Sequence, residues 1–450
     1  MKDYTRFSSH GGIAPIGLWL RQKGIWEAVE KRVDIRQKVI KHTPMEKLLD
    51  AFINILVGGH GLVEVNTRVR PDSGLQRAFG RERCADQSTV SDTLNVCTEE
   101  NVGQMREAMK EIYRTHSKGY KHNYEQGWQV IDVDMTGMPA GRKGEGVTKG
   151  YFSGQRGQRG RQLGRIVATL YDEIVVERLY PGKVQLERSL QGLMEAAEDV
   201  LKPKRRRTIV RVDGGGGRDA DVNWLLKRDY GVIVKVKNWQ RTQKLAQSVT
   251  VWHSDPKVPE REVGWVTEPH RYERQTRQIV IRKPKKNKEW QYRALVFNLN
   301  DATLLWLARC PALSDPTPLQ VLLAAVHAYD LRGGGVETSI KNSKSGLGLT
   351  KRNKRSFTAQ EMLVLLAQLA YNLITWVRDV FTPTTHRLKS YGPLRMVRDL
   401  FHISGIIEMS NQGKLLRITL NEAHQLAPLL VEAFSPHMAR DGTLLNLGQI

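Results

Sequence analysis

The order of strand-like and helix-like patterns between residues 128 and 238 limits the folds open to this chain more than any other feature. Three runs with strand character come first, and a helical pattern then precedes each of the two later strands. The runs cover residues 128–138, 165–171, 174–180, 184–201 (helical), 207–217, 219–231 (helical) and 232–238. This order predicts an α/β fold, with a mixed sheet flanked by helices.

The ribonuclease-H-like fold has this order of elements. Its first and fourth strands each bring one carboxylate to a shared edge of the sheet, and Asp134 and Asp213 occupy these two places here. Asp132 shares a face of the first strand with Asp134, because side chains alternate along a strand, and it competes for the first place. Each aspartate alone is more often a solvated strand residue or a turn former, so the prediction depends on their joint placement.

A third acid comes from the stretch AYDLRGGGVETSIKNSK, residues 328–344. Its three consecutive glycines would each cost roughly 1 kcal/mol relative to alanine inside a helix, so they predict a turn before a helix that carries Glu337. Glu337 and Lys344 are seven residues apart, two helical turns, and therefore share one face. Such a pair is also a common surface salt bridge, and the interpretation as a site requires Tyr329 and Arg332 beside it.

Three carboxylates from separate segments have a chemical use. Phosphodiester cleavage is commonly performed by two divalent ions held between carboxylates, and Mg²⁺ and Mn²⁺ prefer oxygen ligands. Asp134, Asp213 and Glu337 therefore predict a catalytic site with two Mg²⁺ or Mn²⁺ ions. Neither glycine run is followed by Lys-Ser or Lys-Thr, so a nucleotide-binding P-loop is poorly supported.

The charge of the chain indicates its partner. It has 70 Lys and Arg against 47 Asp and Glu, a net charge of +23, with basic runs at 202–207, 282–288 and 351–355. An excess of this size favours a polyanion, either nucleic acid or an anionic membrane surface. The most apolar run, 362–377, is shorter than the roughly 20 residues of a membrane span and contains Gln368. We therefore expect a buried helix there, DNA as the partner and no membrane.

The cysteines and the N-terminus indicate the compartment. Cys84, Cys97 and Cys310 are odd in number and far apart, as in a reducing environment, and no secretion signal is visible. The sequence contains no CxxC pair and no HExxH, so we do not expect a zinc site. These features predict a cytoplasmic protein.

Residues 17–115 have mostly helical patterns. Within 73–96, a short helix ends near Gly80 and Asp86 is placed to cap a second helix. This arrangement resembles a helix-turn-helix, whose second helix presents small polar side chains to base edges, although an ordinary helical hairpin fits equally well. The residues that would face DNA are Gln87, Ser88, Thr89 and Ser91.

Taken in order, the motifs resemble the DDE transposases of bacterial insertion sequences, in the cut-and-paste group with a Tyr-Arg-Glu-Lys signature. They are DMT (134–136), RVDGGGG (211–217), YDLRGGGVETSIKNSK (329–344) and the helical FTAQEMLVLLAQLAYNL (357–373). The likeness covers roughly residues 40–420. The usual signature has three residues between Arg and Glu, whereas this chain has four, Gly333 to Val336, which leaves the reach of Arg332 open.

The resemblance implies a set of roles. Asp134, Asp213 and Glu337 would be metal ligands, and Tyr329, Arg332 and Lys344, with Lys341 on the same segment, would contact DNA near the cut. The protein would bind the terminal inverted repeats of an insertion sequence, cut there with two Mg²⁺ ions and join the freed 3′-hydroxyl to target DNA. Cutting at both ends implies a homodimer on paired DNA ends, associated with a bacterial nucleoid.

The resemblance also implies a division of the chain and a role for tryptophan. The β-rich segment is like the insertion of members that make a hairpin intermediate, where an aromatic residue stacks on an extruded base for roughly 1–3 kcal/mol. Trp252, Trp265 and Trp290 are the candidates, although a buried core position is the commoner one for tryptophan. We expect an N-terminal helical DNA-binding region (1–115), a linker (116–127), a ribonuclease-H-like core (128–239 and 301–380), an all-β insertion (240–300) and a C-terminal region (381–450).

Two other functions remain open from the sequence. A DNA-binding regulator descended from a transposase would keep the fold without catalysis, but it would not need three acids beside phosphate. A structure-selective nuclease of the same fold would cut without requiring terminal repeats.

Overall fold

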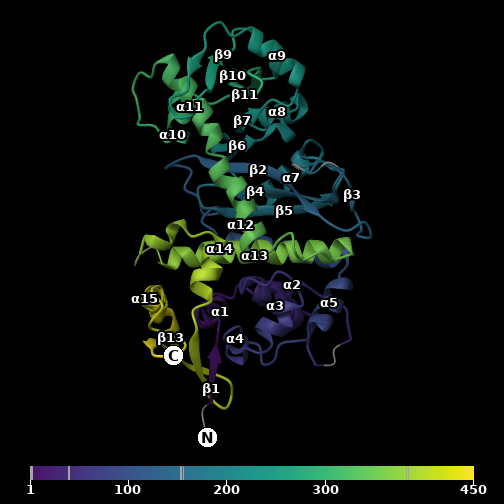
Figure 1. Ribbon diagram of the computed structural model, residues 1–450, viewed down its shortest axis with the longest axis vertical. Coiled ribbons are helices and arrows are strands. Elements are labelled where there is room, and N and C mark those ends of the chain that lie inside the picture. Colours follow the sequence, from purple (N-terminus) through teal and green to yellow (C-terminus); the bar gives the residue numbers. More distant parts are fainter. Residues whose placement is uncertain (1–3, 39–40, 153–154, 156, 382, 384) are drawn as a thin grey trace. The chain divides into compact units, whose positions relative to one another are not determined.

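The computed structural model describes residues 4–38, 41–152, 155, 157–381, 383 and 385–450 (Figure 1). The chain divides into two compact units. Unit 1 comprises Met1–Ser117, Pro139–Val147 and Ser339–Ile450, and unit 2 comprises Lys118–Met138 and Thr148–Thr338. This division differs from the predicted one, because the break at Thr338 separates residues 339–380 from the segment that was expected to complete the core.

Unit 2 is built on one large sheet. Its strands lie in the order β3-β4-β2-β6-β7-β11-β10-β9-β8, and β5 pairs with β4. The strands are β2 (Gln129–Pro139), β3 (Thr148–Lys149), β4 (Arg159–Ala168), β5 (Glu173–Pro181), β6 (Thr208–Val212), β7 (Gly231–Lys235), β8 (His253–Ser254), β9 (Glu262–Trp265), β10 (Arg277–Pro284) and β11 (Trp290–Phe297).

The predicted order of elements in unit 2 is confirmed. β4 and β5 form an antiparallel hairpin, and β6 runs parallel to both β2 and β7. Parallel neighbours need crossover connections, which α7 (Leu186–Leu201) supplies before β6 and α8 (Asp219–Lys227) supplies between β6 and β7. The carboxyl ends of β2, β6 and β7 therefore meet at one edge of the sheet.

The segment expected to be an all-β insertion differs from the prediction in two ways. It begins with a helix, α9 (Trp239–Gln247), which Asn238 caps by accepting a hydrogen bond from the backbone N–H of Arg241. Its strands also extend the main sheet, because β11 pairs antiparallel with β7. That pairing satisfies the backbone groups on the outer edge of β7, which a separate β-domain would leave open.

Two helices complete unit 2 and carry the chain to the third acid. α10 (Asp301–Leu307) and α11 (Pro318–Asp330) bury Leu304, Leu322 and Val326 in a core shared with Ile279 of β10 and Leu295 of β11 (Figure 1). α11 starts with a capping box between Thr317 and Gln320 and with Pro at its first position, both strong start signals. A π-helical segment, η5 (Gly333–Glu337), follows it.

Unit 1 is mainly helical, as its N-terminal part was predicted to be. Its α-helices are α1 (Ala14–Gln22), α2 (Glu27–Arg32), α3 (Pro44–Leu56), α4 (Ser73–Ala78), α5 (Gln87–Asn95), α6 (Glu99–His116), α12 (Thr338–Gly346), α13 (Phe357–Phe381), α14 (Pro393–Arg395) and α15 (Ala427–Ala439). The first residue of α12, Thr338, is the last residue of unit 2. Its four-stranded sheet has the order β1 (Tyr4–Ser8), β12 (Gly405–Met409), β13 (Leu415–Asn421) and β14 (Leu444–Gly448).

Short helical turns make up the remaining helical elements of the two units. They are η1 (Gly11–Ile13), η2 (Val65–Val69), η3 (Arg205–Arg207), η4 (Gly214–Gly216), η6 (Arg387–Ser390) and η7 (Met396–Phe401). Of these, η3 and η4 belong to unit 2.

The long apolar run forms a buried helix, α13, as the sequence predicts, and this helix belongs to unit 1. Within the described part of the chain, it is the one helix long and apolar enough to cross a membrane, and 89% of its most apolar window is buried inside the protein. It contacts α3, α5, α6 and α15. Gln368 and Asn372 are buried with it, which suits a helix surrounded by protein.

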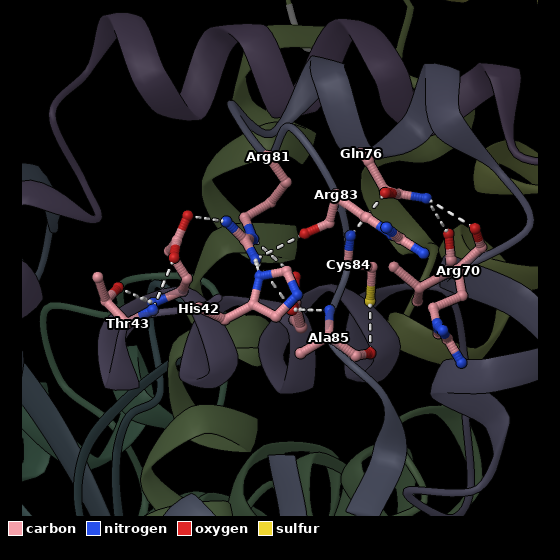
Figure 2. A network of polar contacts seen from close by, with 11 residues as sticks. His42, Thr43, Arg70, Gln76, Arg81, Arg83, Cys84 and Ala85 are labelled. Carbon is pink, nitrogen blue, oxygen red and sulfur yellow. Dashed lines mark hydrogen bonds and ion pairs between the residues drawn. The ribbon is translucent and has the colours of Figure 1, made fainter. Parts of the chain in front are cut away.

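A buried polar network fixes the segment between α4 and α5 (Figure 2). The Arg81 guanidinium is 2% exposed and donates to Asp50 of α3, with 2.8 Å between Nε and Oδ1. Asp50 Oδ2 also accepts the backbone N–H of Ala85 at 2.8 Å, and Gln76 of α4 accepts that of Cys84 at 2.7 Å. These bonds satisfy turn backbone that would otherwise be buried without partners, so the turn has one conformation.

Candidate active site

Asp134 and Asp213 are neighbours because of strand register. β2 and β6 are parallel, and Val133 lies opposite Val212, so the next residue on each chain is one of the two aspartates. β6 ends at Val212 and the chain turns at Asp213, which places both carboxyl groups at the carboxyl edge of the sheet. The interaction between their charges contributes to the pKa of Asp134.

Arg332 links Glu337 to Asp134. The Arg332 guanidinium lies 2.8 Å from Glu337 (Nη1 to Oε1) and 3.0 Å from Asp134 (Nη2 to Oδ2). Its Nη2 also donates to the carbonyl of Val133 at 3.1 Å, and the side chain is only 3% exposed. Arg332 therefore joins two of the three acids in a buried ionic contact.

A kink at Gly335 accounts for the extra residue in the signature. The backbone of Gly335 is not helical and separates two helical turns within η5. The chain therefore does not wind continuously from Arg332 to Glu337, and their side chains still meet, with 2.8 Å between Nη1 and Oε1. The reach of Arg332, left open by the sequence, extends to both Glu337 and Asp134.

Gly335 is required by the packing below this turn. It has φ −95° and ψ −108°, outside the helical range, and a Cβ at this position would lie 2.4 Å from Oδ2 of Asp132. Asp132 is fully buried and cannot move away. The backbone of the turn thus rests directly on the Asp132 carboxylate.

Asp132 itself has a structural partner. Arg211 of β6 donates to both of its oxygens, from Nε at 2.6 Å and from Nη2 at 2.8 Å. Arg211 also donates to the carbonyl of Ala328 in α11 at 2.7 Å. This buried pair connects β2, β6 and α11, so Asp132 holds the edge together while Asp134 faces the cleft.

Asp213 is surrounded by donors. Its Oδ1 lies 3.0 Å from Nζ of Lys235, at the end of β7, and accepts the hydroxyl of Tyr329 at 3.0 Å. Burial raises the pKa of Asp213, but the charges of Lys235 and Arg332 outweigh it and hold this pKa at about 2. Asp213 is therefore a carboxylate at every physiological pH.

The pKa of Asp134 is shifted in the opposite direction. Burial raises its pKa, the charge of Arg332 opposes that rise, and the nearby Asp213 and Glu337 add to it. Two carboxyl groups whose environments push their pKa values apart are a common property of catalytic sites. Burial is the main cause of the raised pKa of Asp134, and a nearby cation would favour its ionised form.

A basic cleft of about 720 Å³ opens in front of the two aspartates. Its wall contains Lys149, Lys183, Lys235 and Lys237, and the side chain of Tyr151 on the same wall is 72% exposed. Lys237 forms an ion pair with Glu187. A cleft with this charge suits a phosphate-bearing ligand.

The donor set suits a hard divalent ion, because the three carboxylates supply oxygen ligands of the kind that Mg²⁺ and Mn²⁺ prefer. Across the described ranges, no three His, Cys, Asp or Glu side chains are grouped closely enough to share one ion. Binding one ion with all three acids therefore requires the side chain of Glu337, which is 57% exposed, to turn from Arg332.

The other predicted DNA contacts lie in unit 1. Lys341 and Lys344 are on α12, which follows η5 in the chain. Gln87, Ser88, Thr89 and Ser91 are on α5, which Asp86 caps as predicted, by accepting the backbone N–H of Ser88 at 2.9 Å. Ser88 is exposed, and Ser91 accepts a hydrogen bond from Lys354. Their roles in DNA binding stay predictions.

The three candidate tryptophans have different environments. Trp265 packs against the core of unit 2, and its indole N–H donates to the carbonyl of Pro318 at 3.2 Å. Trp252 and Trp290 both stack on the guanidinium of Arg282, at 4.1 Å and 4.3 Å from their ring centroids. Base stacking on these two faces would therefore have to displace Arg282.

Sequence reasoning missed Lys235 and Arg282. Both are ordinary basic residues on strands, and nothing in the local sequence distinguishes them. The register of β6 with β7 gives Lys235 its place, because Val212 lies opposite Val234 and the next residues are Asp213 and Lys235. Only a predicted strand pairing would have revealed that contact.

An α/β sheet that gathers acids from separate segments in a basic cleft is typical of enzymes that process nucleic acids. Residues 3–436 match the family described as transposase DDE domain group 1, and this chain belongs to that family. The family resemblance seen in the motifs is thereby confirmed. No curated protein matches the chain.

One solved structure with a detectable likeness is a piggyBac transposase synaptic complex with hairpin DNA, determined by cryo-electron microscopy. The identity is 12%, with a TM-score of 0.46, and the match covers 93% of this chain and 81% of that chain. A likeness of this size does not support an argument about function.

Proposed function

We propose that this chain is a DNA transposase that binds the ends of an insertion sequence, cuts them with divalent metal ions and joins them to target DNA. The observation that carries the proposal is the juxtaposition of Asp134 and Asp213 at one sheet edge, with Glu337 linked to Asp134 through Arg332. Membership in the transposase DDE family supports it.

The scaffold of the reaction is, in this proposal, a ribonuclease-H-like core. The strands β5-β4-β2-β6-β7 support this, since β4 and β5 form an antiparallel hairpin, β4 lies beside β2, β6 runs parallel to β2 and β7 runs parallel to β6. β8 to β11 extend that core at its outer edge. Asp134 lies on its first strand, β2, and Asp213 directly follows its fourth, β6.

Asp134, Asp213 and Glu337 would hold two Mg²⁺ or Mn²⁺ ions. Such ions activate the attacking oxygen and stabilise the leaving oxygen of a phosphodiester. The residues of the chain perform the remaining tasks. Asp213 stays ionised, Tyr329 orients it through its hydroxyl, and Lys149 and Lys183 attract the DNA backbone into the cleft.

DNA recognition is assigned to unit 1 in this proposal. α4 and α5 form the helix-turn-helix, with Gln87, Ser88, Thr89 and Ser91 directed to base edges, and Lys341 and Lys344 on α12 contact phosphates. Two copies act on paired ends, since each end needs one set of acids. The reaction takes place in the cytoplasm, on DNA of the nucleoid.

The test uses Asp213→Asn and the matched control Asp199→Asn, an exposed acid on α7 that pairs with Lys202. Cleavage of linear DNA carrying the element's terminal repeats is measured with and without Mg²⁺. Asp213→Asn should lower the rate by more than about 100-fold while repeat binding stays near wild type, and Asp199→Asn should cut normally. Cutting by Asp213→Asn at the wild-type rate would refute the proposal, and equal cutting of scrambled ends would favour the nuclease.

A further inference from the structure

The carboxylates of the site are already neutralised by cations of the chain. Arg332 contacts Asp134 and Glu337, and Lys235 contacts Asp213. Lys235 has no place in the family motifs, and it lies on β7, the strand beside the one that leads to Asp213. Its role is therefore a separate question from that of the signature residues.

The pairing of β6 with β7 fixes the position of Lys235. Asp213 and Lys235 come one residue after the in-register pair Val212 and Val234. The glycine turn after Asp213 folds onto the end of β7, since Lys237 N–H donates to the carbonyl of Gly217 at 3.1 Å. A Cβ on Gly217 would lie 1.9 Å from the carbonyl oxygen of Lys235, so the close approach requires glycine.

The same turn guides the side chain. A Cβ built on Gly214 would lie 3.5 Å from Cε of Lys235, so the lysine stem passes over this glycine on its way to Asp213. Its ammonium lies 3.0 Å from Oδ1, the oxygen that also accepts the Tyr329 hydroxyl. The Lys235 ammonium and the Tyr329 hydroxyl thus contact the same oxygen of Asp213, and the ammonium is positively charged.

A divalent ion and the Lys235 ammonium compete for the charge of Asp213. Two positive charges held within a few ångströms on one carboxylate repel each other, and each reduces the attraction that the other gains. We infer that Lys235 is an internal counter-cation that occupies Asp213 before metal binds, lowers the metal affinity of the DNA-free site, and leaves Asp213 when the ion enters. The inference rests on the proposed metal-dependent function and deepens it.

The exchange has a consequence for DNA. Lys235 also lines the basic cleft, so its ammonium, once it leaves Asp213, has a phosphate of bound DNA as its natural partner. A phosphate that attracts Lys235 therefore makes Asp213 more available to metal. The site would load its ions more readily with DNA present than without it.

The test measures metal binding rather than activity. Metal-free, DNA-free protein is titrated with Mn²⁺ and the free ion is quantified by electron paramagnetic resonance. The variants are Lys235→Met and Lys235→Gln, and the matched control is Lys237→Met. Lys237 lines the same cleft and carries the same charge, but it pairs with Glu187 instead of an acid of the site.

Lys235→Met and Lys235→Gln should bind Mn²⁺ about fivefold more tightly than wild type, the size expected for losing a partly exposed ionic competitor. Lys237→Met should stay within about twofold of wild type. Equal affinities for the position 235 and 237 variants, or weaker binding by the position 235 variants, would overturn the inference. Absence of saturable Mn²⁺ binding by the wild type and by every variant, with DNA present as well as without it, would instead refute the proposed function.

Discussion

Substituting Gly335 by alanine is the sharpest test of how the turn before Glu337 is built. The added Cβ would lie 2.4 Å from Oδ2 of Asp132 and 2.8 Å from Cγ2 of Thr169. Asp132 cannot yield, because it is fully buried and held by two hydrogen bonds from Arg211. Overpacking of a well-packed site costs about 1–3 kcal/mol, so we expect a loss of this size.

Gly334→Ala is the matched control, since a Cβ there meets nothing within 4 Å. It should change stability by less than about 1 kcal/mol, and a small gain is expected from replacing glycine in a helical segment. Urea unfolding followed by tryptophan fluorescence reports mainly on unit 2, which holds seven of the ten tryptophans. Similar free energies of unfolding for the two variants would refute the account of this turn.

Three further predictions concern other parts of the chain. Asp50→Asn removes the buried one of the two acidic partners of Arg81 and leaves Glu46, so unit 1 should lose about 1.5–3 kcal/mol in thermal or urea unfolding, and a loss below about 1 kcal/mol would contradict the network. Because the pKa of Asp213 is held at about 2, its carboxylate stabilises the protein above pH 4 and this contribution disappears as pH falls towards 2. The melting-temperature difference between wild type and Asp213→Asn should therefore shrink over that window, and a constant difference would argue against the depressed pKa. Burial raises the pKa of Cys97 to about 12, so native protein should react with a thiol reagent at Cys310 well before Cys97, as peptide mapping would show.

Local patterns in the sequence were sufficient for most elements that carry the site. Alternating apolar residues predicted β2 and the β4–β5 hairpin, and Asp86 was recognised as the cap of α5. The buried helix α13 followed from its uniform apolar character and its two amides. In each case the signal lies within one segment, where propensity and periodicity operate.

Features that depend on pairing between distant segments were not predictable in the same way. The alternation rule put Asp132 and Asp134 on one face of β2, but it did not reveal that Arg211 and Gly335 cover the first of them. The contact of Lys235 with Asp213 depends on the register of two strands. Likewise, the extension of the sheet by β8 to β11 depends on which edge of β7 remained open.

The kinked turn at Gly335 shows both sides of this limit. The spacing of four residues between Arg332 and Glu337 was visible in the sequence as a departure from the family signature. Whether these side chains still meet depends on the backbone between them, and the kink at Gly335 leaves them 2.8 Å apart. An insertion in a motif is therefore compatible with its geometry when the backbone absorbs one residue.

The central claim is that the three acids grip divalent ions at the carboxyl edge of the sheet. The most direct measurement is the anomalous diffraction of Mn²⁺ in crystals of the protein with and without DNA. The account predicts a Mn²⁺ peak within about 2.2 Å of oxygens from both Asp134 and Asp213, with Lys235 displaced and Glu337 turned towards the ions. Saturating Mn²⁺ that leaves Lys235 on Asp213, or that binds only elsewhere, would contradict it.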